Sequence, residues 1–227
     1  DKLVYAATNI LAMEAMTKYA CVAFDDGQDV RLESAAAKMF VAERAWNIVD
    51  NMMQIRGGRG YETWQTLSKR ELTPPDEIMW TGARPNRIFE GANELMVQLI
   101  FREGTDRYIK TGLPLMSKES GLIEKLNAAI TMSGYYLKTY DNRSVFPAVG
   151  EKLIEHLVYI EEMSRKLARK IITKSAKYQA KLAVKQLTLD RFSRIAVELG
   201  AMTLTCAFAR QLDGASGGDG HYSELAD

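Results

Sequence analysis

Apolar residues that recur in steps of three and four positions are the feature that most constrains the fold of this sequence. One series places its members on a single helical face: Ala35, Met39, Ala42, Trp46, Val49 and Met53. A second series near the end of the chain has the same spacing: Phe192, Ile195, Leu199, Met202 and Cys206. No alternating pattern typical of a strand persists. The sequence therefore predicts an all-α protein, built as an up-and-down helical bundle.

The same patterns, together with Gly and Pro, predict how the bundle is divided. We expect helices over residues 2–24, 32–55, 92–108 and 121–139, a long helix from Pro147, and a last helix that reaches Leu212. Pro74-Pro75 excludes a continuous helix through the irregular stretch 61–84, and the Gly-rich stretch 213–220 predicts a flexible segment. Gly112 and Pro114 mark a junction, so we expect two units, residues 1–112 and an additional helical region over 113–227.

Composition excludes several functional classes. Thirty basic and twenty-nine acidic residues leave almost no net charge, so nothing indicates a nucleic-acid partner. With only two histidines, we expect no metal site and no His-based triad, and we expect Cys21 and Cys206 to be small core residues. No apolar run reaches the roughly 18 residues of a membrane span. The helical pattern already includes Asp1-Lys2-Leu3, so we expect a piece of a longer protein.

Residues 87–95 combine a carboxylate, a glycine and the start of a helix. Glu90 stands before Gly91, and Asn93 opens the next helical pattern. A helix N-terminus gathers unpaired N–H groups and partial positive charge, and glycine allows a ligand to approach closely. A carboxylate base beside such donors suits proton abstraction next to a thioester carbonyl. The simpler interpretation is an acidic residue that stabilises a helix start.

A Gly-rich turn over residues 54–61 follows the second helix. Gly57-Gly58 ends that helix, because glycine readily adopts the left-handed conformation of a C-cap. No strand precedes these glycines, so the nucleotide-binding fingerprint is missing. The turn is either an ordinary loop or a place where Gly57 and Gly58 expose backbone groups to a phosphate-bearing cofactor.

These two segments, in this order and at this separation, resemble the C-terminal helical domain of acyl-CoA dehydrogenases. The resemblance extends to about Tyr108 and includes residues 32–38, Trp46 and the signature Ile88-Phe89-Glu90-Gly91. It implies an FAD-dependent enzyme of fatty acid β-oxidation that converts an acyl-CoA into a trans-2-enoyl-CoA, with an electron-transfer flavoprotein as acceptor. It also implies that domains absent from this sequence complete the pocket, so this chain alone should be inactive.

The resemblance assigns a role to each residue of the two segments. Glu90 would be the base that removes the α-proton while the β-hydride passes to N5 of FAD, and Phe89 and Gly91 would contact the substrate. Contacts with FAD of the same subunit would come from Ala92, Asn93 and Glu94. Contacts with FAD of a neighbouring subunit would come from Gln54, Ile55, Arg56, Gly57 and Gly58.

The sequence departs from the family pattern in three places, and the first two support an alternative, a non-catalytic helical module that serves assembly. Ala92 stands where most members have Thr, and Thr81-Gly82-Ala83-Arg84 keeps only the last arginine of the usual Arg-Asp-x-Arg. An insertion over Trp64–Leu72 lengthens the loop after Tyr61.

The region beyond Gly112 resembles the extended very-long-chain type of the family, which implies a homodimer and peripheral membrane contact. The segment Arg165–Lys185 has eight basic residues and no acidic one: Arg165, Lys166, Arg169, Lys170, Lys174, Lys177, Lys181 and Lys185. If helical, its lysines form one stripe opposite Leu167, Ile171 and Leu182. Such a helix can lie on an anionic bilayer, although a solvated face of a bundle helix is the simpler interpretation.

Overall fold

The computed structural model describes residues 1–70, 76–117, 119–140, 151–215 and 220–226. Every regular element within these ranges is helical, so the prediction of an all-α fold is confirmed for them. The α-helices are α1 Lys2–Asp25, α2 Arg31–Arg56, α3 Trp64–Leu67, α4 Asp76–Ala83, α5 Asn93–Met116, α6 Leu122–Lys138, α7 Glu151–Tyr178, α8 Gln186–Ala215 and α9 His221–Ala226. Three 3₁₀ turns are η1 Gly57–Tyr61, η2 Arg84–Arg87 and η3 Gln179–Val184.

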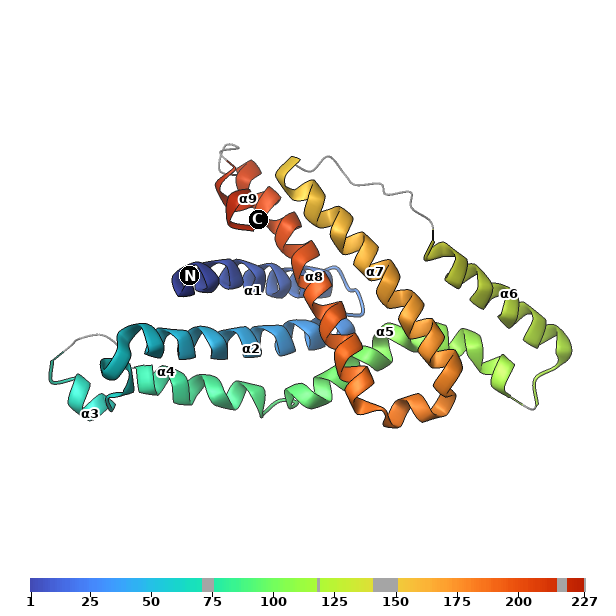
Figure 1. The fold of residues 1–227 in the computed structure, drawn as a ribbon, viewed down its shortest axis with the longest axis horizontal. Helices are drawn as coiled ribbons and strands as arrows, with labels where there is room; N and C mark the ends of the chain where they lie inside the picture. Colours follow the sequence, from blue (N-terminus) through green and yellow to red (C-terminus); the bar gives the residue numbers. More distant parts are fainter. Residues whose placement is uncertain (71–75, 118, 141–150, 216–219, 227) are drawn as a thin grey trace.

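The core lies where α1, α2, α5 and α8 meet. In Figure 1, α1 and α2 run side by side, α4 and α5 follow along α2, and α8 crosses this layer obliquely next to α7. Buried side chains of four helices form one cluster: Met16, Ala35, Ala37, Met39, Phe40, Val97, Ile100, Val197 and Ala201. Burial of this apolar surface is the main force that holds the helices together. The division into units 1–112 and 113–227 stays a prediction.

The apolar face predicted for α2 is the face that the helix buries. Ala35, Met39, Ala42 and Val49 are buried, whereas Trp46 is half-buried and packs against Trp80 of α4, with ring centroids 4.9 Å apart. The helix ends at Gly57, whose φ of 59° is in the region that glycine tolerates best.

Helix α5 is longer than its sequence predicts. It does not end near Tyr108 but continues through Gly112 and Pro114 to Met116. Packing of α6 overrides the two helix-breaking residues, because Tyr108 meets Tyr135 edge-on at 5.1 Å and Gly112 lies beside the Met132 side chain. Pro114 lies two residues before the end of α5, so its missing N–H and its ring disturb only the final part of the helix.

The stretch between Tyr61 and Arg84 is broken into short helices rather than irregular throughout. Residues 71–75, which contain Pro74-Pro75 and the end of the predicted insertion, lie outside the described residues, as does the predicted helix start at Pro147. Helix α4 was missed because eight residues are too few for a clear apolar period. Leu67 of α3 is 1 % exposed and fixes this stretch to the fold.

The end of α7 and the end of α8 both differ from the prediction. Helix α7 stops at Tyr178, and Gln179 adopts a φ of 47°, so Lys181 and Lys185 belong to η3 and the turn after it and do not continue the stripe on α7. Helix α8 includes Asp213, which was expected in a flexible segment. The carboxylate of Asp213 instead accepts hydrogen bonds from the backbone N–H groups of Tyr222 and Ser223 at the start of α9.

By length and composition, α8 could also cross a membrane, since one 18-residue window has a mean hydropathy of 1.3. The same composition suits a helix that packs on several sides. Val197 and Ala201 of α8 belong to the core cluster, and the hydroxyl of Ser193 donates a buried hydrogen bond to the carbonyl oxygen of Val97, over 2.8 Å.

The two cysteines differ in exposure, so the expectation that both are core residues is wrong for Cys21. Cys206 is buried, whereas Cys21 is exposed, because it lies on the outer face of α1. Burial raises the pKa of the Cys206 thiol, which makes its reactive thiolate scarcer still. We expect a thiol reagent to modify Cys21 rapidly in the native chain and Cys206 only after unfolding. Mass spectrometry of the labelled chain checks this, and rapid double labelling would contradict it.

Candidate functional site

The Glu90 turn, residues 88–92, joins η2 to α5. Glu90 has a φ of 53° and Gly91 a φ of 92°. A left-handed conformation is uncommon for a residue other than glycine, and such conformations cluster at functional sites. A Cβ added to Gly91 would lie 2.5 Å from Cε of Met96. The turn therefore needs glycine at position 91 and presents the exposed Glu90 side chain just before the N-terminus of α5.

A lysine of α2 holds the backbone of this turn. Nζ of the half-buried Lys38 donates a hydrogen bond to the carbonyl oxygen of Gly91 and a second one, of 2.9 Å, to Oδ1 of Asn93. Hydrogen bonds from a charged donor are stronger than those between neutral groups. Lys38 thus joins the carbonyl next to Glu90 to the first residue of α5.

Asn93 connects Lys38 to α8 through further hydrogen bonds. Its side chain is 1 % exposed, and Nδ2 lies 3.4 Å from the carbonyl oxygen of Met39 and 3.5 Å from Oε1 of Glu43. Both carboxylate oxygens of Glu43 accept hydrogen bonds from Arg194 of α8, at 3.0 and 2.9 Å. Arg194 also donates to Asp190, over 2.8 Å. A continuous network of hydrogen bonds therefore connects the Glu90 turn through α2 to α8.

Lys38 lies in an acidic environment. Burial lowers the pKa of its ammonium group, and the carboxylates of Glu94 and Glu90 act against this shift. The two glutamates that flank the start of α5 therefore favour the charged form of Lys38.

The predicted substrate and flavin residues near Glu90 are placed in different ways. Phe89 is 47 % exposed, and Glu90 and Glu94 are exposed as well. Ala92 is the N-cap of α5 and makes no side-chain capping bond. The side chain of Asn93 points into the fold, so this residue could offer a flavin only its backbone.

The second predicted segment, residues 54–58, comprises the last three residues of α2 and the first two of η1. Gln54, Ile55, Gly57 and Gly58 are exposed, and a Cβ added to either glycine would meet nothing within 4 Å. A phosphate-bearing ligand could reach this backbone. Nε of Arg56 lies 3.3 Å from the buried carboxylate of Asp76, which connects the segment to α4.

The structure does not bring the two segments together. The Glu90 turn contacts α2 at Lys38, and Gln54 lies sixteen residues further along the same helix, about 24 Å at the helical rise. The Glu90 turn and the exposed backbone at the end of α2 are therefore separate features of this chain.

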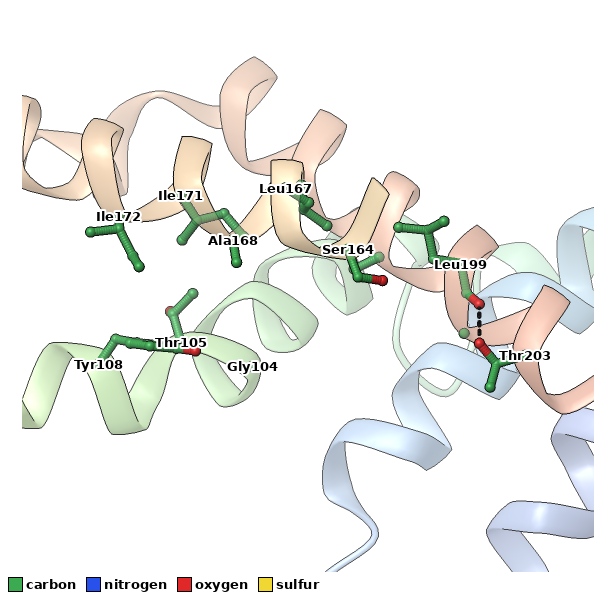
Figure 2. Close-up of a pocket in the computed structure, with 12 residues that line it drawn as sticks. Gly104, Thr105, Tyr108, Ser164, Leu167, Ala168, Ile171, Ile172, Leu199 and Thr203 are labelled. Carbon is green, nitrogen blue, oxygen red and sulfur yellow. Dashed lines mark hydrogen bonds between the residues drawn. The ribbon is translucent and has the colours of Figure 1, made fainter. Parts of the chain in front are cut away.

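Two cavities lie away from both segments. One of about 330 Å³ lies between α5, α7 and α8, and Figure 2 shows Thr105 and Tyr108 of α5 facing Ile171 and Ile172 of α7. The second, of about 310 Å³, includes Leu32 and Glu33 and lies between α1, α2, α5 and α8. Neither cavity is lined by a residue of the predicted site.

Sequence reasoning missed two residues that shape the site. Lys38 was noticed only as part of the stretch 32–38, and its contact with Gly91 depends on how α2 packs against α5. Gly60 received no role in the sequence analysis, yet a Cβ there would lie 2.5 Å from the carbonyl oxygen of Met53. A lysine within an apolar helical series was the one signal that could have pointed to Lys38.

The sequence of this chain is similar to those of known proteins. Residues 1–105 match the family described as "Acyl-CoA dehydrogenase, C-terminal domain". Probable acyl-CoA dehydrogenase FadE10 of Mycobacterium tuberculosis is 36 % identical over 218 residues, which cover 92 % of this chain and 34 % of that protein. The mitochondrial very long-chain specific acyl-CoA dehydrogenase of Bos taurus is 25 % identical over 220 residues, 92 % of this chain and 31 % of that protein.

A further relative matches less than half of the chain. The (2S)-methylsuccinyl-CoA dehydrogenase of Cereibacter sphaeroides is 33 % identical over 105 residues, which cover 46 % of this chain and 18 % of that protein. The chain spans about a third of the length of the two relatives that match most of it. Residues 1–105 thus form an acyl-CoA dehydrogenase C-terminal domain, and homology to acyl-CoA dehydrogenases extends over 92 % of the chain.

Proposed function

We propose that this chain is the C-terminal portion of an FAD-dependent acyl-CoA dehydrogenase that converts a fatty acyl-CoA into a trans-2-enoyl-CoA in β-oxidation. The observation that carries the proposal is the Glu90 turn, in which an exposed carboxylate is held in a left-handed conformation at the start of a helix. When bound, FAD supplies the acceptor for the hydride. An electron-transfer flavoprotein is the proposed partner that takes the electrons onward.

Glu90 acts as the general base in this proposal. Its carboxylate accepts the α-proton, the electron pair of that C–H bond forms the Cα–Cβ double bond, and hydride leaves the β-carbon. The N–H of Glu90 stabilises the negative charge that develops on the thioester oxygen, which requires donors fixed in advance. Phe89 and Gly91 border the acyl-CoA on either side of the base.

The separation of the two segments supports a homodimer. With about 24 Å along α2 between Lys38 and Gln54, the residues Ala92, Asn93 and Glu94 would contact the flavin of their own subunit. The open backbone of Gly57 and Gly58, with neighbours Gln54, Ile55 and Arg56, would contact the flavin of the second subunit. The remainder of the full-length protein would complete each pocket, and the 227-residue chain alone would not turn over substrate.

The alternative function, a non-catalytic assembly module, rests on Ala92. A threonine at this N-cap would bring a hydroxyl to the start of α5, whereas Ala92 brings none. The flavin content of the full-length protein separates the two functions. An enzyme is expected to purify with about one FAD per subunit, and an assembly module without it.

We also propose that the protein touches anionic membranes through the segment Arg165–Lys185. Three lysines gather within 6 Å of one aromatic ring, with Nζ of Lys174, Lys177 and Lys185 at 5.3, 5.6 and 4.6 Å from the centroid of Tyr178. Val184 and Leu187, beside this cluster, are each 78 % exposed. Basic residues around an exposed apolar tip suit an anionic bilayer surface.

Charge reversal tests the membrane proposal. The triple variant Lys170→Glu, Lys174→Glu, Lys177→Glu is expected to weaken binding to anionic vesicles at low salt by at least tenfold, because each charge contributes about 1 kcal/mol. Vesicle co-sedimentation of the full-length protein measures this. Reversal of Lys18, Lys110 and Lys138, exposed on other helices, should have a much smaller effect. Equal binding by the wild type and the first variant would contradict the proposal.

A further inference from the structure

The carbonyl of Gly91 is the point at which the rest of the fold can control Glu90. Glu90 and Gly91 are two consecutive residues with positive φ. For Glu90 this conformation is costly, and it persists only where the surrounding structure imposes it. Nζ of Lys38 binds the carbonyl oxygen of Gly91, one peptide unit from the proposed base. Release of that carbonyl would let the turn relax and move the carboxylate.

Lys38 is itself held in place. Its second hydrogen bond, of 2.9 Å, goes to Oδ1 of Asn93, whose 1 % exposed side chain cannot turn towards solvent. Glu43 lies 3.5 Å from Nδ2 of Asn93, and the two-fold contact with Arg194 fixes the Glu43 carboxylate. Arg194, the last residue of this hydrogen-bond network, belongs to α8 and lies outside the residues 1–105 that match the family domain.

We propose that Lys38 is the positioning residue of the Glu90 turn, and that Arg194 of α8 supports it through Glu43 and Asn93. This inference rests on the proposed function. In it, α2 sets the place of the base, and α8 couples the C-terminal extension to the reacting end of the site. Lys38 contacts neither substrate nor flavin, so it acts through the conformation of the turn.

The test measures the rate at which palmitoyl-CoA reduces the flavin of the full-length protein, in an anaerobic stopped-flow experiment. Lys38→Met is expected to reduce its flavin about 10²-fold more slowly, because a misplacement of the base by about 1 Å has that effect. The apparent Kd for the acyl-CoA should change by less than about threefold, since the remainder of the full-length protein would supply most of the acyl-CoA pocket. Lys38→Arg can still donate to both oxygens and should recover part of the rate.

Two further variants sharpen the test. Lys110→Met removes another lysine ammonium, one that is 71 % exposed and pairs with Asp106 one turn earlier in α5. The flavin of this variant should be reduced at the wild-type rate. Arg194→Met should slow flavin reduction about 3- to 10-fold, less than Lys38→Met, because Arg194 acts on the turn only indirectly, through Glu43 and Asn93. Its side chain is 41 % exposed, so its removal should leave the core intact.

The outcomes separate this inference from the proposed function. A folded, flavin-loaded Lys38→Met that reduces at the wild-type rate would overturn the inference alone. If Lys38→Met does not fold, a wild-type rate in Arg194→Met overturns it instead. A wild type whose bound flavin is not reduced by any acyl-CoA overturns the proposed function and this inference with it.

Discussion

Glu90→Gln in the full-length protein is expected to keep its flavin and to lose reduction by acyl-CoA, with a rate about 10²- to 10⁴-fold below that of the wild type. Glutamine keeps the size and most of the hydrogen-bonding capacity of glutamate but cannot accept the α-proton. The Glu90 side chain is exposed, so the substitution should not disturb packing. Anaerobic bleaching of the flavin absorbance measures the effect.

A matched variant shows whether the loss is specific to Glu90. Glu14→Gln changes an exposed carboxylate on α1, far along the chain from the turn, and should bleach at the wild-type rate. If Glu90→Gln also bleached at that rate, Glu90 would not be the base, and the bland interpretation of an acidic residue at a helix start would be correct.

The second large effect is expected on stability, from Gly60→Ala. A Cβ at position 60 would lie 2.5 Å from the carbonyl oxygen and 2.8 Å from Cα of Met53. These are backbone atoms of α2, which cannot swing aside as a flexible side chain can. Overpacking of this kind typically lowers the free energy of unfolding by about 1–3 kcal/mol.

The same turn provides the control for this substitution. A Cβ at Gly58 would meet nothing within 4 Å, so Gly58→Ala should leave the stability unchanged within about 1 kcal/mol. Urea denaturation followed by tryptophan fluorescence suits the comparison, because the three tryptophans, Trp46, Trp64 and Trp80, lie on α2, α3 and α4 around the turn. Equal midpoints for the two variants would mean that the close approach at Gly60 does not exist.

The helices that the sequence predicts best are those with long apolar series. In α2 the predicted residues Ala35, Met39, Ala42 and Val49 are all buried, so the period of the apolar pattern matches the face that the helix buries. The end of α5 was predicted wrongly because Gly112 and Pro114 are poor helix formers in isolation. Only the contact with α6, which local sequence does not encode, explains why the helix continues.

The candidate site was predictable as far as it is local. Glu90 and Gly91 are neighbours in the chain, and their positive φ angles suit a turn before a helix. The support from Lys38 was not predictable, since it joins residues 53 positions apart in the sequence. The same holds for Arg194, which reaches Glu43 across 151 positions. Such contacts depend on helix packing and become visible only in three dimensions.

The most direct test of the account is an anaerobic titration of the full-length wild-type protein with palmitoyl-CoA and with butyryl-CoA. We expect the protein to contain about one FAD per subunit, and we expect the flavin absorbance to bleach, faster with palmitoyl-CoA if the extended region favours long chains. A protein that purifies without flavin and binds none when FAD is added, or one whose flavin stays oxidised with both substrates, would contradict the proposed dehydrogenase and favour the assembly module.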